Sequence, residues 1–157
     1  MNYESITKRG CAMRIAISSD HGGNLLRQEV IDLLTERGVE YEDFGPKTNE
    51  SVDYPDYATP VCEGVVAGRF DRGILICGTG IGMSIAANKI KGIRCALVHD
   101  VFSAKATRGH NDTNVLAMGE RVIGAGLARE IVETWLDTPF EGGRHGRRID
   151  KVMQLEN

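Results

Sequence analysis

Several features are scarce or missing from this sequence, and each absence excludes a class of protein. No apolar run approaches the roughly 20 residues that a membrane-spanning helix requires, and no segment resembles a secretory signal. The cysteines are few and form no CxxC pair, which argues against a disulfide scaffold and favours a reducing, cytoplasmic compartment: they are Cys11, Cys62, Cys77 and Cys95. Positive charge is not in excess, because 19 Lys and Arg residues face 22 Asp and Glu residues for a net charge of −3. We therefore expect neither nucleic acid nor a membrane as a partner.

What is present is ordinary globular composition. The chain has 157 residues, of which 41% are hydrophobic and 26% are charged, and this suits a single domain with its own core. Residues 1–12 show no hydrophobic period, and Met13 directly precedes the first apolar run. We therefore expect a poorly ordered extension over residues 1–12 and one domain over residues 13–157.

The domain alternates between strand-like and helix-like segments. Short apolar or β-branched runs predict strands at 14–19, 39–44, 73–77, 93–98 and 114–118. Helical spacing predicts helices at 22–37, 58–67, 82–90, 100–108 and 126–136, a last helix from about Arg147, and a loop over 47–55. This alternation implies a three-layer α/β/α sandwich with a Rossmann-like, open parallel sheet of about five strands. Ligands bind such sheets beyond the carboxyl ends of the strands, so residues that follow strands are the candidates for function.

The strongest local signal is the glycine-rich segment CGTGIGMS at 77–84, between a predicted buried strand and a predicted helix. Glycines at 78, 80 and 82 allow backbone N–H groups to turn toward an anion, with a helix N-terminus behind them. The phosphate-loop pattern GxxxxGK[ST] is absent, and the dinucleotide pattern GxGxxG would need glycine at Met83. Asp100 does lie at about the distance of a ribose-binding acid, so a dinucleotide remains an alternative, as does a tight turn without a ligand.

Three further groups have both a structural and a functional interpretation. Cys77 is the last residue of its predicted strand. In the structural interpretation it is a small buried hydrophobe, and in the functional one it is a base or nucleophile beside a helix N-terminus. Asp20 and His21 form either an acid/base pair or a helix N-cap with an exposed histidine. His110 and Asn111 lie in a predicted loop, as a proton-shuttling site or a polar turn.

A basic cluster and the histidines complete the candidates. A group of arginines stands at a predicted helix start: Arg144, Arg147 and Arg148. A bound anion such as phosphate would compensate their charge there, and Arg121 could join them. The alternative is a solvated helix end without a ligand. The four histidines, His21, His99, His110 and His145, show no HxxxH spacing, so we expect no metal site.

Together these segments resemble the type B ribose-5-phosphate isomerases, of the sugar-phosphate isomerase family that also contains the galactose-6-phosphate isomerase subunits. The matching stretches are SSDHGG at 18–23, VDYPDYA at 52–58, GILICGTGIGMSIAANKIKGIRCAL at 73–97, HNDTNVLAMGERVIG at 110–124 and EGGRHGRRI at 141–149. The resemblance extends from Met13 to the end of the chain.

The resemblance implies a cofactor-free and metal-free aldose–ketose isomerase that interconverts D-ribose 5-phosphate and D-ribulose 5-phosphate through a cis-enediolate, a step of the non-oxidative pentose phosphate pathway. It implies catalytic roles for Cys77 as the base at C2, Thr79 as its proton-handling neighbour, and His110, with Asp20 nearby, as the ring-opening acid/base. It implies an anion hole from the N–H groups of 78–84, including Gly78, Gly80, Gly82 and Ser84. It further implies that Asn111 and Tyr54 hold sugar hydroxyls and that the phosphate is held by His21, Arg121, Arg144 and Arg148.

The resemblance also implies a homodimer or tetramer whose active sites lie at subunit interfaces.

Alternative functions remain within and outside the isomerase class. A hexose 6-phosphate, such as allose or galactose 6-phosphate, is the alternative substrate, because no spacing in the sequence measures the distance from the enediolate to the phosphate. A nucleotide-dependent oxidoreductase and a sugar-phosphate-binding regulatory module are the rival classes.

Overall fold

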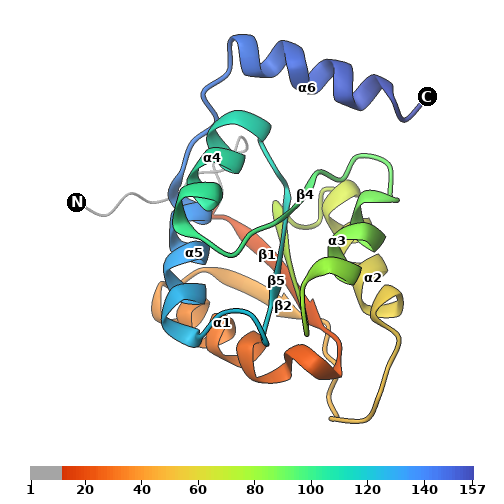
Figure 1. Cartoon of the computed structure of the whole chain (residues 1–157), viewed down its shortest axis with the longest axis vertical. Coiled ribbons are helices and arrows are strands. Elements are labelled where there is room, and N and C mark those ends of the chain that lie inside the picture. Colours follow the sequence, from red (N-terminus) through yellow and green to blue (C-terminus); the bar gives the residue numbers. More distant parts are fainter. Residues whose placement is uncertain (1–11) are drawn as a thin grey trace.

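A computed structural model describes residues 12–157, so the extension expected at the N-terminus lies almost entirely outside the described residues. The five predicted strands are confirmed as one parallel sheet (Figure 1): β1 Arg14–Ser19, β2 Glu40–Asp43, β3 Arg72–Cys77, β4 Cys95–Leu97 and β5 Val115–Gly119. Their order is β2-β1-β3-β5-β4, so β3 lies at the centre and β2 and β4 are the edges. The predicted α/β/α sandwich is therefore correct.

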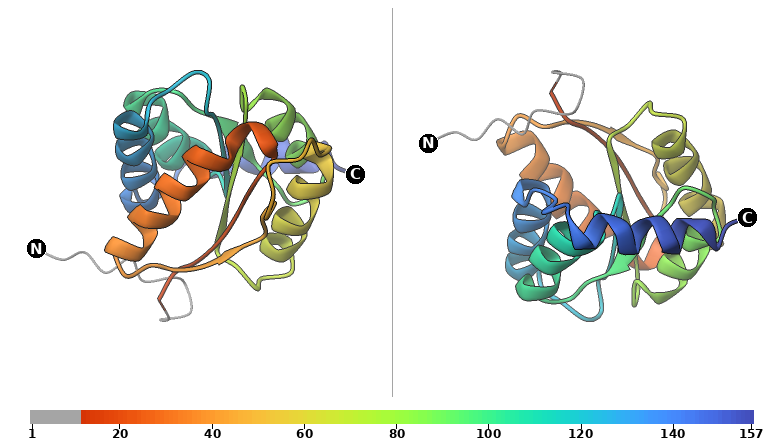
Figure 2. Two further views of the ribbon diagram at one scale, coloured as in Figure 1. Left: turned by 90° about the horizontal axis from the view of Figure 1, so that it is seen from below. Right: turned by 90° about the horizontal axis from the view of Figure 1, so that it is seen from above.

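The helices cover both faces of this sheet and one of its ends. They are α1 Asn24–Glu36, α2 Tyr54–Val66, α3 Ile81–Asn88, α4 Val101–Asn111, α5 Ala125–Asp137 and α6 Arg144–Gln154, with a 3-10 turn, η1, at His21–Gly23. Helices α1, α4 and α5 lie on one face, and α2 and α3 lie on the other (Figures 1 and 2). Helix α6 stands across one end of the sandwich and has no buried residue.

Two apolar layers follow from the alternation of side chains along the buried strands. Ile74 and Ile76 of β3 pack with α1 and α5 around the fully buried Trp135, whereas Leu75 and Cys77 pack on the α2 and α3 side. The apolar run of β3 is continuous because both of its faces are covered. Cys77 is the last residue of this strand, so its thiol lies at the carboxyl end of the sheet, on the face covered by α2 and α3.

The structure corrects several predicted boundaries. The predicted loop 47–55 ends early, because Tyr54 and Pro55 begin α2, where proline needs no N–H partner. Helix α4 extends past the predicted residue 108, so His110 and Asn111 lie in its last turn and not in a loop. Asp112 ends the helix with φ +45° and accepts a hydrogen bond from Arg108 at 2.8 Å. Helix α6 begins at Arg144, three residues before the predicted start.

Asp100 proves to be the N-cap of α4. Its carboxylate accepts hydrogen bonds from the backbone N–H of Ser103 at 2.6 Å and from the Ser103 hydroxyl at 2.8 Å. These contacts are those of a helix cap and leave little of the carboxylate for a ribose, which removes one support of the dinucleotide alternative.

Within residues 12–157, no helix combines the length and apolar character that a membrane crossing demands.

Candidate active site

The candidate site lies between β1 and β3, where the order in which successive strands join the sheet reverses. β1 is followed by β2 on one side and β3 on the other, so the carboxyl ends of β1 and β3 flank the switch point at which open α/β sheets bind ligands. The loops after these two strands touch. The Asp20 N–H donates to the Ile76 carbonyl at 3.1 Å, and a Cβ on Gly22 would lie 3.3 Å from the Gly78 nitrogen.

Asp20 and His21 form the first wall of the site. The Asp20 carboxylate accepts the Gly22 N–H at 2.8 Å as the cap of η1, and the residue is nearly buried. His21 is exposed, and its Nδ1 accepts the Val52 N–H at 3.1 Å. This bond fixes the ring against the loop before α2 and leaves Nε2 without a partner among the described residues, available to a ligand.

The glycine-rich loop forms the second wall. Gly80 has φ +76°, the left-handed conformation that favours glycine, and this turn brings its N–H to 3.1 Å from the Cys77 sulfur. The Thr79 hydroxyl accepts the Ile81 N–H at 3.3 Å. Among residues 12–157, the N–H groups of Gly78 and Thr79 donate no hydrogen bond. The loop therefore presents free amides beside a thiol that is only 5% exposed.

The predicted anion hole is shorter than 78–84. The Ser84 N–H donates to the Gly80 carbonyl at 3.0 Å, and the Ser84 hydroxyl donates to the Ile81 carbonyl at 2.7 Å. Ser84 therefore does not contribute to the hole, because the helix has already used its polar groups. Gly82 lies in the first turn of α3, where N–H groups have no partner within the helix.

Tyr54 and Arg121 lie against the same loop. A Cβ on Gly82 would lie 2.8 Å from Cζ of the Tyr54 ring, and a Cβ on Gly78 would lie 3.4 Å from Nε of Arg121. Tyr54 comes from the start of α2 and Arg121 follows the end of β5, so residues of two other segments meet the glycine-rich loop that follows Cys77.

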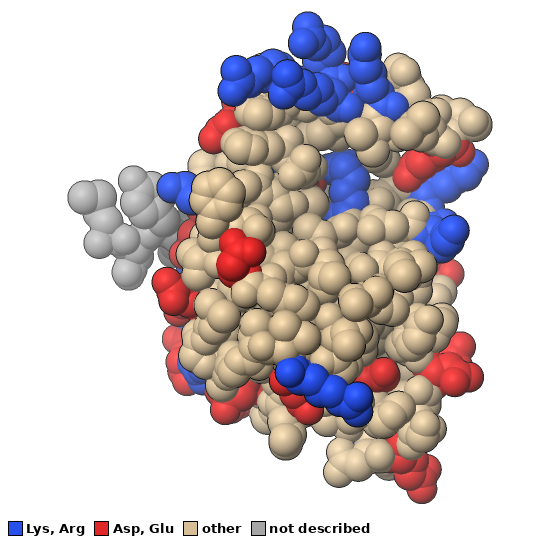
Figure 3. All heavy atoms as spheres, in the orientation of Figure 1, with Lys and Arg blue, Asp and Glu red and all other residues tan. Residues whose placement is uncertain are grey.

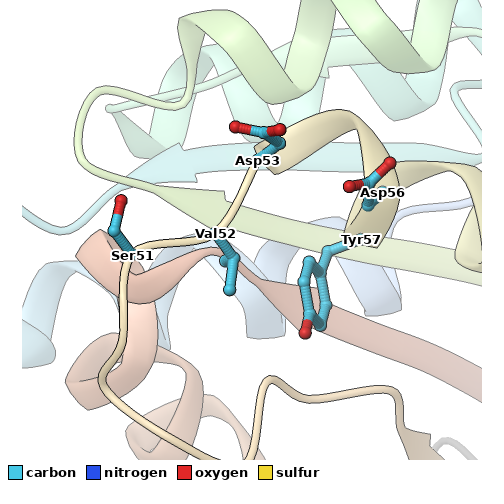
Figure 4. A pocket seen from close by; sticks show the side chains of 5 residues that line it. All are labelled: Ser51, Val52, Asp53, Asp56 and Tyr57. Atoms are coloured by element: carbon cyan, nitrogen blue, oxygen red, sulfur yellow. The ribbon is translucent and has the colours of Figure 1, made fainter.

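An open hollow of about 560 Å³ lies at the start of α2, and Figure 4 shows the side chains that line it. It is lined by the residues just before and within the start of α2: Ser51, Val52, Asp53, Asp56 and Tyr57. Val52 links it to His21. Its carboxylates can accept hydrogen bonds from hydroxyl groups and would repel a phosphate, so the hollow suits the uncharged part of a polyol.

The other predicted residues lie at the opposite end of the sheet. Helix α4 starts after β4 and runs back, so His110 and Asn111 lie near the strand beginnings, where the Asn111 carbonyl accepts from Nε of Arg94 at 3.1 Å. Helix α6, with Arg144 and Arg148, is joined to the same end, since Arg94 contacts the Met153 sulfur at 3.4 Å. The six residues of β3 alone rise roughly 16 Å. His110 is therefore not near Asp20 within one chain, which corrects the expected pairing.

Figure 3 shows the charge at this second end. Lys and Arg side chains gather along α6, at the top of the view. Among them are Arg144, Arg147, Arg148 and Lys151. The first turn of α6 contains no acidic residue that could balance this positive charge. The predicted phosphate ligands are thus divided, with His21 and Arg121 at one end and Arg144 and Arg148 at the other.

Two further residues, the half-buried His99 and the buried Arg27, support the first end, and the sequence analysis assigned no role to either. Nε2 of His99 accepts the Gly119 N–H at 2.9 Å, and burial lowers the pKa of this histidine. Gly119 in turn lies against the Thr79 backbone. Arg27 donates to Ser19 Oγ and, at 2.6 Å, to the Pro46 carbonyl, so it fixes the end of β1. His99 follows a strand, which is a usable signal, whereas no motif marks Arg27 within its predicted helix.

These features define a class: a three-layer α/β enzyme with its site at the switch point of a parallel sheet. The particular family follows from comparison with known proteins. The chain belongs to the Ribose/Galactose Isomerase family, which matches residues 15–152.

Individual relatives agree over nearly their whole lengths. The chain is 66% identical over 145 residues to a putative sugar phosphate isomerase, YwlF, of Bacillus subtilis, covering 92% of this chain and 97% of the relative. It is 50% identical over 143 residues to ribose-5-phosphate isomerase B of Escherichia coli, covering 91% and 96%. The structure of Clostridium thermocellum ribose-5-phosphate isomerase B superposes with a TM-score of 0.90 at 54% identity, covering 92% and 97%.

Proposed function

We propose that this protein is an isomerase that interconverts D-ribose 5-phosphate and D-ribulose 5-phosphate. The observation that carries this proposal is the Cys77 thiol at the switch point, beside the unpartnered N–H groups of Gly78 and Thr79. The family and the named relatives support the same assignment.

The proposed chemistry is an internal transfer of hydrogen. In the open-chain aldose, the Cys77 thiolate takes the proton from C2, and the electron pair of that C–H bond forms the C1–C2 double bond. The carbonyl π electrons move to O1, and the loop amides stabilise the resulting enediolate charge. A proton is then delivered to C1 while the proton on the C2 hydroxyl leaves, with Thr79 as the neighbouring hydroxyl. Oxidation at C2 balances reduction at C1, so the reaction needs no external oxidant or cofactor.

Ring opening and phosphate binding involve the second end of the molecule. In the proposal, His110 moves the proton between the ring oxygen and the anomeric hydroxyl, with Asn111 and Tyr54 holding hydroxyls. Arg144 and Arg148, with Arg121 and His21, hold the phosphate through charge-assisted hydrogen bonds. Because His110 lies a sheet length from Cys77 within one chain, a second copy must bring its own His110, Asn111, Arg144 and Arg148 to this Cys77.

The proposed assembly is a homodimer, or a tetramer made of two such dimers. Apolar side chains are exposed on neighbouring elements next to the glycine-rich loop, on α3, on the edge strand β4 and at the start of α4: Ile81, Ile85, Leu97 and Phe102. Phe102 is 82% exposed, which is unfavourable for an isolated chain. A cytoplasmic location is part of this proposal, supported by the three described cysteines, all of which are free.

The test is isomerisation of ribose 5-phosphate by the purified protein in EDTA, beside allose 6-phosphate and galactose 6-phosphate. We expect turnover of the pentose and a large preference for it over both hexoses. The matched variant is Cys77→Ser, which keeps the size of the side chain and replaces the base; we expect it to lose exchange of the C2 proton with solvent deuterium. A Cys77→Ser protein as fast as the parent, or a preference for a hexose, would contradict the proposal.

A further inference from the structure

A cluster of two imidazoles and a carboxylate lies beside the start of α6. Nε2 of His145 is 3.2 Å and Nε2 of His110 is 3.7 Å from the same oxygen, Oε2 of Glu141. The two rings are stacked, with centroids 4.4 Å apart, and the three ligand atoms all lie within 4.8 Å of one another. The histidines come from α4 and α6, so their proximity is not visible as spacing in the sequence.

The backbone of Glu141 is anchored to α4, which keeps the carboxylate of this cluster beside that helix. The Glu141 N–H donates to the Gly109 carbonyl of α4 at 3.0 Å, and a Cβ on Gly109 would lie 3.3 Å from Glu141 Oε1. Gly142 and Gly143 have positive φ and turn the chain back, so His145 comes to lie beside Glu141. The His145 side chain is only 11% exposed, whereas that of His110 is 48% exposed and able to rotate.

These residues match the ligands and distances of a transition-metal site. Two histidines and a glutamate are a known ligand set for Zn²⁺, which binds their nitrogen and oxygen atoms at about 2.0–2.2 Å. In a tetrahedral site, neighbouring ligand atoms are then roughly 3.3 Å apart, close to the distances of both histidines from Glu141. The two rings are nearly parallel, with an interplanar angle of 9°, so the exposed His110 ring has to rotate out of the stack for its lone pair to point at the same centre as that of His145, and water completes the coordination.

We propose that His110, Glu141 and His145 form a binding site for Zn²⁺ or a cation of similar ligand preference. Imidazole nitrogens select such cations over Mg²⁺ and Ca²⁺, which prefer oxygen. The arginines of α6 lie close by and add positive charge, so the affinity is lower than that of a four-ligand structural zinc site.

The site has a functional consequence that rests on the proposed isomerase activity. His110 is the proposed ring-opening acid/base, and its Nε2 lone pair is the one that a bound cation takes. Zn²⁺ therefore inhibits the isomerase reversibly, and bound sugar phosphate, which contacts the same histidine, opposes Zn²⁺ binding.

The binding experiment is independent of activity. Tag-free protein carrying Cys11→Ser and Cys77→Ser, which removes two thiols that could compete, is titrated with Zn²⁺ against a chromophoric chelator. We expect one equivalent to bind, with the dissociation constant raised at least about tenfold by His145→Gln and by Glu141→Gln. Glu130→Gln, the same change at an exposed carboxylate of α5, is the matched control and leaves Zn²⁺ binding unchanged. Thermal unfolding of each variant confirms that it is folded.

Two further measurements separate the outcomes. Co²⁺ in the same protein gives d–d bands without the thiolate charge-transfer band that a cysteine ligand produces. In protein with its cysteines intact, Zn²⁺ lowers the isomerisation rate and EDTA restores it. Unchanged Zn²⁺ binding in His145→Gln, or a thiolate band with Co²⁺, would overturn the site. Variant-sensitive binding in a protein that does not turn over ribose 5-phosphate would leave the site standing and reject the isomerase proposal instead.

Discussion

The backbone N–H of Gly80 donates a hydrogen bond to the sulfur of Cys77 over 3.1 Å. The bond exists because Gly80 turns the chain at φ +76° directly after the buried end of β3. One glycine thus sets the position of the thiol, of the free amides at 78 and 79, and of the first turn of α3.

Gly80→Ala should damage both stability and activity. A Cβ there would lie 2.6 Å from Leu97 Cδ1 and 2.8 Å from the Met118 carbonyl carbon, in addition to the unfavourable φ. We expect a loss of about 1–3 kcal/mol in the free energy of unfolding, measured with urea. Gly126→Ala is the control, because nothing lies within 4 Å of its Cβ and it lies in the first turn of α5, where alanine should not lower the free energy of unfolding. Equal stability of the two variants would contradict this account of the loop.

The proposed division of the site between two chains can be tested by mixing inactive variants. Cys77→Ser and His110→Gln each disable one half of every site. In a mixed dimer, one of the two sites combines an intact Cys77 with an intact His110, so unfolding and refolding the mixture should restore about a quarter of the parent activity. Each variant refolded alone is the control. No recovery in a mixture that does form mixed dimers would mean that each site is built within a single chain.

Arg148→Ala should weaken binding of the phosphorylated substrate. A charge-assisted hydrogen bond to phosphate is lost, and we expect KM to rise roughly 10- to 100-fold with a smaller change in kcat. Arg147→Ala, on the neighbouring position of α6, is the matched control and should leave KM near that of the parent. Steady-state kinetics of both variants decide this, and an unchanged KM in Arg148→Ala would remove this residue from the phosphate site.

His99 should make stability depend on pH. Its Nε2 accepts the Gly119 N–H, so the neutral ring is the one that fits, and burial lowers the pKa below the ordinary value of about 6.5. The unfolded chain takes up the proton first. The stabilisation is therefore fully present above about pH 6.5 and is lost as the pH falls through the lower, folded pKa.

The measurement is the urea midpoint between pH 8 and pH 5 for the parent and for His99→Gln. The parent should lose more stability over this range than the variant, whose amide does not titrate. Identical slopes for the two proteins would show that His99 does not contribute to the pH dependence.

The parallel sheet and the loop that follows β3 could be predicted well from the sequence. Local rules suffice there, because the short apolar run at 73–77 is bounded by a glycine-rich segment, which favours a strand covered on both faces followed by a turn. Boundaries were less accurate where a tertiary contact decided them. Arg94 donates to the carbonyls of Asn111 at 3.1 Å and Asp112 at 2.7 Å, so a residue directly before β4 holds the end of α4, and no pattern within 100–112 marks that end.

What the sequence by itself determined is therefore the order of elements, the family, and the identity of the residues at each strand end. Only the tertiary structure decided which of those residues meet. It brings Tyr54 and Arg121 to the Cys77 loop, keeps His110 and the arginines of α6 a sheet length away, and joins His110 to Glu141 and His145. The physical reason is that hydrophobic periods and turn residues act over a few positions, whereas the direction in which a helix returns along a sheet is fixed by packing of the whole chain.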